Sequence, residues 1–235
     1  MCNFFRLNNL KYLITFTMLQ YHLRALHRRW EVLDDEVWAK LVVMEKAEGA
    51  AKAYIKTPVL SVDGADTGFD GRSVGLGGLE SGRAGDKESA MVKLLIEEGC
   101  RLKLTQNGDI LIKRDDNLNM FAFRSKHSQH STSDIILKQP YGLLQKDKTY
   151  KLFDMKKFQE HLSQELLTEN PDWSELEKQV YLHLYIQMAD FANFKQTVSI
   201  FTFAKFTEDV LEAPVWIVLV NVVALHVIKT LRSST

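Results

Sequence analysis

The chain has 235 residues, of which 46% are hydrophobic, and its 30 basic and 30 acidic residues leave a formal net charge of zero. This length fits one domain with appendages, and the neutral balance gives no overall attraction to nucleic acid or to anionic membranes. The two cysteines, Cys2 and Cys100, are too few for a disulfide framework, so we expect a reducing, intracellular compartment.

Two apolar stretches resemble membrane segments but do not meet the criteria for them. Residues 10–26 are interrupted by charged and polar side chains and contain no small-residue cleavage site, so they are not typical of a secretory signal. Residues 215–228 are strongly apolar but shorter than the roughly 20 residues that a spanning helix requires. We therefore expect no transmembrane segment.

Residues 1–36 predict a helical extension at the edge of the domain. Leu19, Leu23, Leu26 and Trp30 recur at helical spacing, with arginines on the opposite face. A helix packed on the domain edge fits this pattern, and so does a helix that binds a partner or a membrane surface. We favour the first interpretation.

The hydrophobic period changes to that of strands after residue 37. Trp38–Glu45 and Ala51–Ile55 predict a hairpin that turns at Glu48–Ala50. Val59–Val62 predicts a short strand, and a turn-rich loop follows at residues 63–73.

The turn-rich loop and the glycines behind it are not typical of ligand sites. The twelfth position from Asp66, which must be glutamate in a calcium loop, is Gly77. The glycines of Ser73–Leu79 miss the spacing of a dinucleotide fingerprint, so they favour close backbone packing of a core strand.

Gly99–Asp116 predicts the central hairpin. A three-residue loop at Gln106–Gly108 pairs Leu102 with Ile112 and Leu104 with Ile110, which places apolar side chains on one face. The helix before it, Asp86–Glu98, is predicted to be capped by Asp86, to end at Gly99 and to use Met91, Leu94 and Leu95 as its apolar face.

The other face of this hairpin is the candidate partner-binding or phosphate-binding site. Clustered arginine and lysine suit recognition of phosphate or carboxylate, although a solvated face balanced by neighbouring acids is the favoured alternative. The candidate residues are Arg101, Lys103 and Lys113, with Arg114 and Arg124 nearby.

Strands and a polar loop follow the hairpin. Leu118–Phe123 and Tyr150–Phe153 predict strands. Ser125–Ser133 predicts an exposed polar loop, in which His127 and His130 lack a cysteine or carboxylate at metal-ligand spacing.

The C-terminal third predicts helices around two further strands. Asp154 caps a helix whose stripe runs from Met155 to Leu166, and Asn170 caps a second helix with proline at its first position. The remaining predicted elements are a strand at Val180–Ile186, a less regular one at Thr197–Phe203, a strand buried on both faces at Trp216–Val223, and a closing helix at Ala224–Leu231. About nine strands and four helices, with strands in the middle, favour an antiparallel β-sandwich with helical caps.

Five strings occur in an order found in one known family. They are VLSVDG at Val59–Gly64, the strand Val74–Leu79, the helix and hairpin Val92–Leu104 with its Asn-Gly-Asp turn, YKLFDMKKFQEHL at Tyr150–Leu162, and Pro214–Trp216 with the closing helix. Together they resemble the Mad-homology 2 (MH2) domain of Smad proteins over residues 37–231. We therefore divide the chain into an extension, 1–36, and an MH2-like domain, 37–235.

The resemblance implies a fold and a class of function. It implies a β-sandwich with a three-helix bundle at one end and a loop–helix region at the other, related to forkhead-associated domains. It also implies binding of other proteins, often in homo- or heterotrimers, without catalysis, cofactor or metal. No G-x-S-x-G elbow, P-loop, H-E-x-x-H or C-x-x-C motif is present, so we expect no enzyme.

The sequence departs from the family in three places. Residues 1–36 are too short for the DNA-binding domain that precedes MH2 in Smads, so no direct DNA binding is expected. Met188–Phe194 lacks the Gly-Trp-Gly and basic residues of the receptor-reading loop, and the end at Ser233, Ser234 and Thr235 lacks the Ser-Ser-x-Ser tail. Residues 189–211 match worst, as a true insertion or a gene-model error.

The segment 28–46, together with the string VDGADTGFDG at residues 62–71, resembles divergent insect Smad-like proteins that hold only this domain. That resemblance implies a cytoplasmic scaffold, at the apical cortex, in tracheal tube-size control and apical chitin organisation. The alternative is a nuclear transcriptional cofactor in TGF-beta-like signalling that joins Smad assemblies through the trimer surface.

Overall fold

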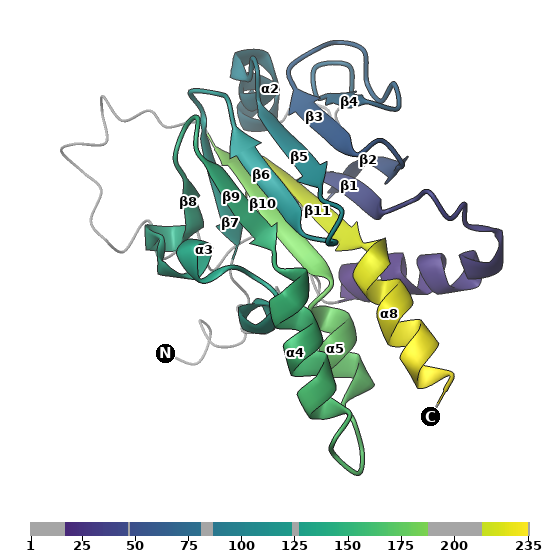
Figure 1. The fold of residues 1–235 in the computed structure, drawn as a ribbon. Coiled ribbons are helices and arrows are strands. Elements are labelled where there is room, and N and C mark those ends of the chain that lie inside the picture. The colour runs from purple at the N-terminus through teal and green to yellow at the C-terminus, as the bar shows by residue number, and fades with distance from the viewer. Residues whose placement is uncertain (1–16, 47, 81–86, 124–126, 188–212, 235) are drawn as a thin grey trace, which may run out of the picture.

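The computed structural model describes residues 17–46, 48–80, 87–123, 127–187 and 213–234, in which two sheets pack face to face (Figure 1). Sheet A has the strand order β2 (Glu48–Ile55), β1 (Ala39–Glu45), β11 (Val215–Asn221), β10 (Tyr181–Gln187), β7 (Asn119–Phe123) and β8 (Leu143–Leu144). Sheet B has the order β4 (Ser73–Gly75), β3 (Val59–Asp63), β5 (Cys100–Leu104), β6 (Ile110–Arg114) and β9 (Thr149–Phe153). Neighbouring strands are antiparallel except β3 and β4, which are parallel.

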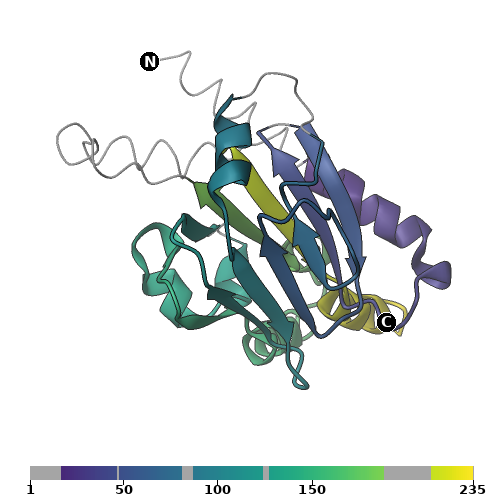
Figure 2. The ribbon, with the colours of Figure 1, turned by 90° about the horizontal axis from the view of Figure 1, so that it is seen from above.

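Helices gather at both ends of the sandwich. Helices α4 (Met155–Glu165), α5 (Trp173–Lys178) and α8 (Val222–Arg232) lie at one end, and α2 (Lys87–Leu95) lies at the other with the β3–β4 loop (Figure 1). A further helix at residues 17–28 runs beside β1 and β2 (Figure 2). The predicted sandwich with helical caps is therefore confirmed. The remaining elements are α3 (Asp134–Lys138) and the 3-10 turns η1 (Trp30–Val32), η2 (Ser128–His130) and η3 (Pro140–Gly142).

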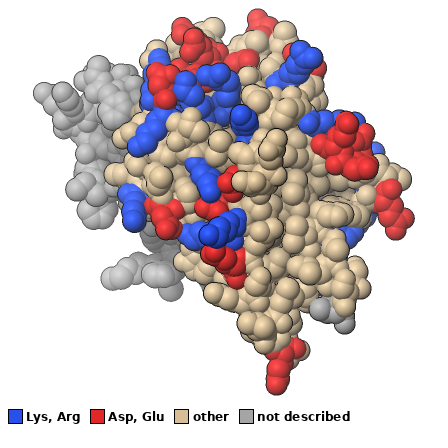
Figure 3. Space-filling view, in the orientation of Figure 1, with Lys and Arg blue, Asp and Glu red and all other residues tan. Residues whose placement is uncertain are grey.

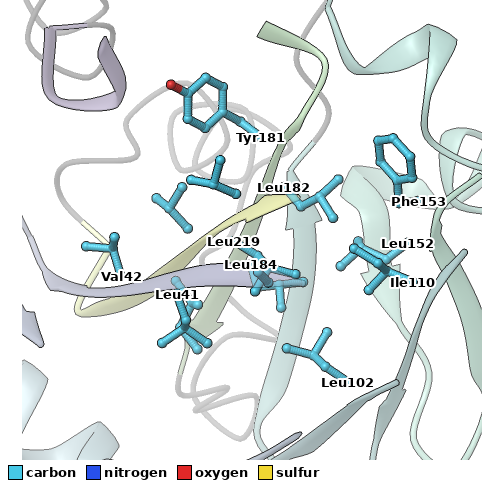
Figure 4. Close-up of a cluster of buried hydrophobic side chains, with 14 of the residues drawn as sticks. Leu41, Val42, Leu102, Ile110, Leu152, Phe153, Tyr181, Leu182, Leu184 and Leu219 are labelled. Carbon is cyan, nitrogen blue, oxygen red and sulfur yellow. The ribbon is translucent and has the colours of Figure 1, made fainter. Parts of the chain in front are cut away.

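The central hairpin has the predicted register. Leu102 lies opposite Ile112 and Leu104 opposite Ile110, across a turn in which Gly108 has a φ of 82°. Leu102, Ile110 and Ile112 are buried, and Figure 4 shows Leu102 and Ile110 pointing toward side chains of sheet A. The three-residue turn works because glycine adopts this left-handed conformation without the steric cost that other residues incur.

Strand β11 is buried along its whole length, as predicted. One face packs against sheet B and the other lies beneath the helix at residues 17–28, so neither face needs polar side chains. The strand ends at Asn221, whose side chain accepts a hydrogen bond from the Ala224 N–H (3.0 Å) and thereby caps α8.

Helix α2 buries a different face from the predicted one. Met91, Leu94 and Leu95 are exposed, whereas Val92 and Ile96 are in the core. The polar residues on the buried face find partners, because the Ser89 hydroxyl donates to the Pro214 carbonyl and the Lys93 ammonium pairs with Glu45 at 2.8 Å. The helix has two apolar faces, and these tertiary partners decide which one is buried.

Two substitutions in α2 test this correction. We expect Val92→Ala to lower the free energy of unfolding by about 2 kcal/mol, because it removes fully buried methyl groups. Leu94→Ala should change it by less than about 0.5 kcal/mol, because Leu94 is 77% exposed. Urea denaturation measures both values, and a larger loss from Leu94→Ala would restore the predicted face.

One turn and one helix cap lie at different residues from those predicted. The β1–β2 pairing continues to Glu45 opposite Glu48, with a register shift after Val43, so the expected turn residues Glu48–Ala50 lie inside β2. Helix α5 is capped by Asp172, whose carboxylate accepts the Glu175 N–H (3.0 Å), and not by Asn170. The cap of α4 is the predicted Asp154, which accepts the Lys157 N–H.

The glycine-rich strand and the polar loop are also corrected. The strand at Ser73–Leu79 ends at Gly75, although its glycines do approach backbone closely, as predicted: a Cβ on Gly75 would lie 2.2 Å from the Ala65 carbonyl oxygen. The described part of the loop before α3 is largely buried: Ser128, Ser131, Thr132 and Ser133 are buried, and the Ser131 hydroxyl donates to the Gln179 carbonyl. The Asp86 cap, Arg124, Met188–Phe194, residues 189–211 and the strand at Thr197–Phe203 lie outside the described residues.

Candidate interaction surface

The outer face of sheet B brings together three of the predicted cations. Arg101 lies opposite Lys113 in the β5–β6 register, and Lys103 is two residues along β5 from Arg101. Leu102 and Ile112 point inward, so strand alternation turns Arg101, Lys103 and Lys113 outward together. We call these three residues the sheet B cations.

Asp115 neutralises two of the sheet B cations. The Arg101 guanidinium donates from Nε to Oδ2 (2.6 Å) and from Nη2 to Oδ1 (2.9 Å) of Asp115. The Lys113 ammonium lies 2.8 Å from the same carboxylate and 3.3 Å from that of Asp147. Figure 3 shows the result, with blue and red side chains interspersed on the side of the molecule that faces the viewer in Figure 1.

The Asp115 pair predicts a loss of stability in acid. The hydrogen bond from Arg101 and then that from Lys113 lower the Asp115 pKa from 3.8 to about 2, so folding favours the ionised carboxylate. The stabilisation is complete above pH 4 and is lost as the pH falls toward 2. With Arg101 largely solvated, we expect Asp115→Asn to cost about 1 kcal/mol at pH 7 and only a small fraction of that at pH 2, where the folded-state carboxyl is about half protonated. Denaturation at both values measures this, and an equal cost at both would contradict the pairing.

Lys103 differs from its two neighbours. It is exposed, and no described acidic side chain pairs with it. In the sheet it lies between Val59, which is 40% exposed, and the half-buried Leu111. The next cation along this row, Lys151, is held by Asp109 (3.0 Å) and Asp154 (3.1 Å). Lys103 therefore presents an ammonium with apolar side chains on either side.

Arg114 does not lie on this face. It follows Ile112 by two residues and so points to the same, inner side, where it is 8% exposed. Its guanidinium donates to the Leu118 carbonyl (3.2 Å) and to the Asn119 side-chain oxygen (3.0 Å), which ties β6 to β7. Arg124, the fifth candidate, lies outside the described residues.

The histidines of the loop before α3 belong to packing contacts. His127 bonds Glu175, and the His130 ring stacks on His161 with the ring centroids 3.8 Å apart. Across the described parts of the chain, no three ligand-type side chains are grouped so that they could hold a metal ion. Nor does any described helix have the length and apolar character needed to cross a membrane.

The five strings that resemble the MH2 family lie in the two sheets and the helices at their ends. A family model described as the MH2 domain matches residues 36–222. The chain belongs to the MH2 domain family. MH2 domains are protein-interaction modules, so the outer faces of this one are where its function is to be sought.

Comparisons with solved structures show the same fold at low identity. The structure of STAT2 in complex with IRF9 matches with a TM-score of 0.54 and 10% identity, over 84% of this chain and 99% of that chain. The structure of the interferon regulatory factor 9 IAD domain matches with a TM-score of 0.53 and 9% identity, over 86% and 92%. A search of curated proteins finds no match. At these identities the likeness to solved structures concerns the SMAD/FHA-like fold alone.

The sequence analysis expected neighbouring acids to balance the sheet B cations of this MH2 domain, but it did not say which acids they are. Asp115 lies two residues after Lys113, so strand alternation places both on the same side of the chain, and this signal was available. Asp147 comes from a turn in which it has a φ of 61°, and its approach to Lys113 has no comparable signal in the sequence.

Proposed function

We propose that this MH2 domain is a non-enzymatic scaffold that binds partner proteins through the outer face of sheet B. The single observation that carries the proposal is Lys103, an exposed ammonium between Val59 and Leu111 that no described acid neutralises. A cation flanked by apolar side chains suits a partner segment that carries phosphate or carboxylate beside an apolar residue.

The ion pairs of the neighbouring cations decide which cation an incoming anion can bind first. Arg101 and Lys113 are held by Asp115, so an incoming anion must compete with that carboxylate before it can use them. Lys103 requires no such exchange. A dianionic phosphate competes better than a carboxylate because it carries more charge and more acceptor oxygens.

Calorimetric titration with matched peptides tests the proposal. The probe is a Ser-Ser-x-Ser peptide in phosphorylated and plain forms, because that is the family's phosphorylated tail. We expect the phosphorylated peptide to bind at least ten-fold more tightly, and Lys103→Ala to remove most of the difference. Lys156→Ala, at a position whose side chain is 85% exposed on α4, is the control and should change nothing. Equal binding of both peptides would refute the phosphate-reading face.

The setting that we propose is the epithelium, in the cytoplasm and at the apical cortex. The support is the resemblance of residues 28–46 to insect Smad-like proteins such as expansion, which implies roles in tracheal tube-size control and apical chitin organisation.

A second candidate is a Smad-type transcriptional cofactor that acts in the nucleus through the trimer surface. The observation that favours it is the bundle of α4, α5 and α8 at one end of the sandwich, with α2 and the β3–β4 loop at the other. Sedimentation of the purified chain, alone and mixed with a Smad MH2 domain, separates the candidates. A monomer under both conditions would count against the cofactor.

A further inference from the structure

The outer face of sheet A is covered by the helix at residues 17–28, which lies outside the family match. The strand register places Lys40 between Tyr54 and Val220 on this face, with Tyr181 beyond Val220. The neighbouring row holds Lys52, Val42 and Val218. The face under the helix is thus apolar along β11 and basic toward β2.

The helix docks through apolar side chains and two backbone carbonyls. Leu23 and Leu26 are 4% and 0% exposed. The Tyr181 hydroxyl donates to the Leu19 carbonyl (2.7 Å), and the Lys40 ammonium donates to the His22 carbonyl (3.2 Å). These contacts show that this face of sheet A accepts a helix with apolar residues at this spacing.

The charges between the helix and the sheet are mismatched. Lys40 is 3% exposed, and burial and then the charges of Lys52 and Arg29 lower its pKa to about 8; no acid among the described residues acts on it. His22 is also buried, its Nδ1 has no hydrogen-bond partner, and burial and then Lys40 lower its pKa to about 4. The covering helix therefore places the buried His22 beside Lys40, while Arg24, Arg28 and Arg29 are exposed.

The other groups around the helix do not supply the missing counter-charge at Lys40. Residues 17–28 contain no aspartate or glutamate. Glu177 of α5 lies 3.6 Å from His27, close to Lys229 and Arg232 of α8, at the C-terminal end of the helix. Trp30 stacks on His226, with Lys229 over its ring. The described acid, Glu177, thus lies at the C-terminal end of the helix, whereas Lys40 and Lys52 lie on the sheet beneath it.

We propose that the face of sheet A beneath residues 17–28 is a docking site for an acidic amphipathic helix of a partner protein, which displaces the chain's own helix. A partner with the same apolar spacing and a carboxylate at the place of His22 would give Lys40 a counter-ion, which none of the described residues supplies. The described partners of the Lys40 ammonium are the His22 carbonyl and the Tyr54 ring, 5.8 Å from its centroid, and neither carries a negative charge. A hydrogen-bonded ion pair offsets more of the cost of burying a charge, so the acidic helix is the better occupant. This site is on the opposite sheet from the sheet B cations and can fail independently of them.

Peptide binding to the full chain tests the site. The probe is a fluorescein-labelled peptide of residues 17–30 carrying His22→Glu and Arg29→Glu, compared with the native-sequence peptide. The target carries Leu23→Asp, which prevents its own helix from docking. We expect the acidic peptide to bind at least ten-fold more tightly, and Lys40→Met in the same target to remove the difference. Equal binding of the two peptides, or no binding of the acidic one, would overturn the proposal.

If the Leu23→Asp chain does not fold, limited proteolysis of chains that keep Leu23 tests the same proposal. In the otherwise native chain, His22→Glu should slow tryptic cleavage after Arg28 at least five-fold, because the helix then docks more firmly over Lys40. His27→Glu is the matched control, and it should speed cleavage because Glu177 lies opposite. Unchanged cleavage in His22→Glu, or equal slowing in both variants, would overturn the proposal.

Discussion

Asp116→Ala should lower the free energy of unfolding by about 3 to 5 kcal/mol, because it leaves three backbone N–H groups without their acceptor. One carboxylate oxygen of Asp116 accepts the N–H groups of Glu97 (2.7 Å) and Gly99 (3.0 Å), and the other accepts that of Leu118 (2.7 Å). Asp116 is 4% exposed, so water does not readily replace these bonds. Urea denaturation monitored by circular dichroism measures the loss.

The neighbouring residue is the control for Asp116. Asp115 bonds side chains on the outer face and no backbone N–H through its carboxylate. Asp115→Ala removes the same atoms one residue earlier and should cost only about 1 kcal/mol, because its partners Arg101 and Lys113 can turn to solvent. Equal losses from the two substitutions would mean that the bonds from Asp116 to the Glu97, Gly99 and Leu118 N–H groups do not stabilise the fold as proposed.

Gly99→Ala should lower the free energy of unfolding by about 2 to 4 kcal/mol, because alanine is strained in a left-handed backbone conformation and its Cβ would clash. Gly99 has a φ of 60°, and a Cβ there would lie 1.8 Å from the Val62 carbonyl oxygen. Because that atom belongs to the backbone of β3, either strand β3 or the start of β5 must move. Thermal unfolding of the variant measures the cost.

Gly108→Ala separates the two contributions. Gly108 also has a positive φ, 82°, but a Cβ there would first meet the flexible side chain of Met155 at 2.9 Å. We expect a loss of about 1 kcal/mol, close to the conformational cost alone. A loss as large as that of Gly99→Ala would show that the close approach to β3 has no special weight.

Local signals were sufficient where one residue type fixes the backbone or one face must be buried. Gly108 in its turn and the alternation through Leu102 and Ile112 fixed the β5–β6 register, and Asp154 marked the start of α4. The six consecutive apolar residues of β11, residues 215–220, allowed no exposed face. Ordered strings of this kind were also enough to identify the MH2 family.

Tertiary partners decided the elements that the sequence could not predict. Both apolar faces of α2 were suitable for burial until Ser89 and Lys93 found Pro214 and Glu45, which are distant in sequence. Short elements such as α3 and β8 carry too few residues for a period to be read, and they were missed. Asp172 prevailed over Asn170 as the cap of α5 because its carboxylate reaches the Glu175 N–H.

The sequence predicted where the candidate surface lies and that acids would balance it, but not which acid pairs with which cation. Alternation places Arg101, Lys103 and Lys113 on one face, whereas the contact with Asp147 arises from a turn that the sequence does not specify. Arg114 needed only the same alternation rule to be excluded from that face. What distinguishes Lys103 from the other cations is therefore visible only in the folded chain.

The location of a tagged chain in epithelial cells, with and without Lys103→Glu, tests the proposed scaffold most directly. We predict that the native chain gathers at the apical cortex and that Lys103→Glu, at an exposed position that should leave folding intact, spreads through the cytoplasm. Nuclear accumulation of the native chain, or cortical retention of the variant, would contradict it.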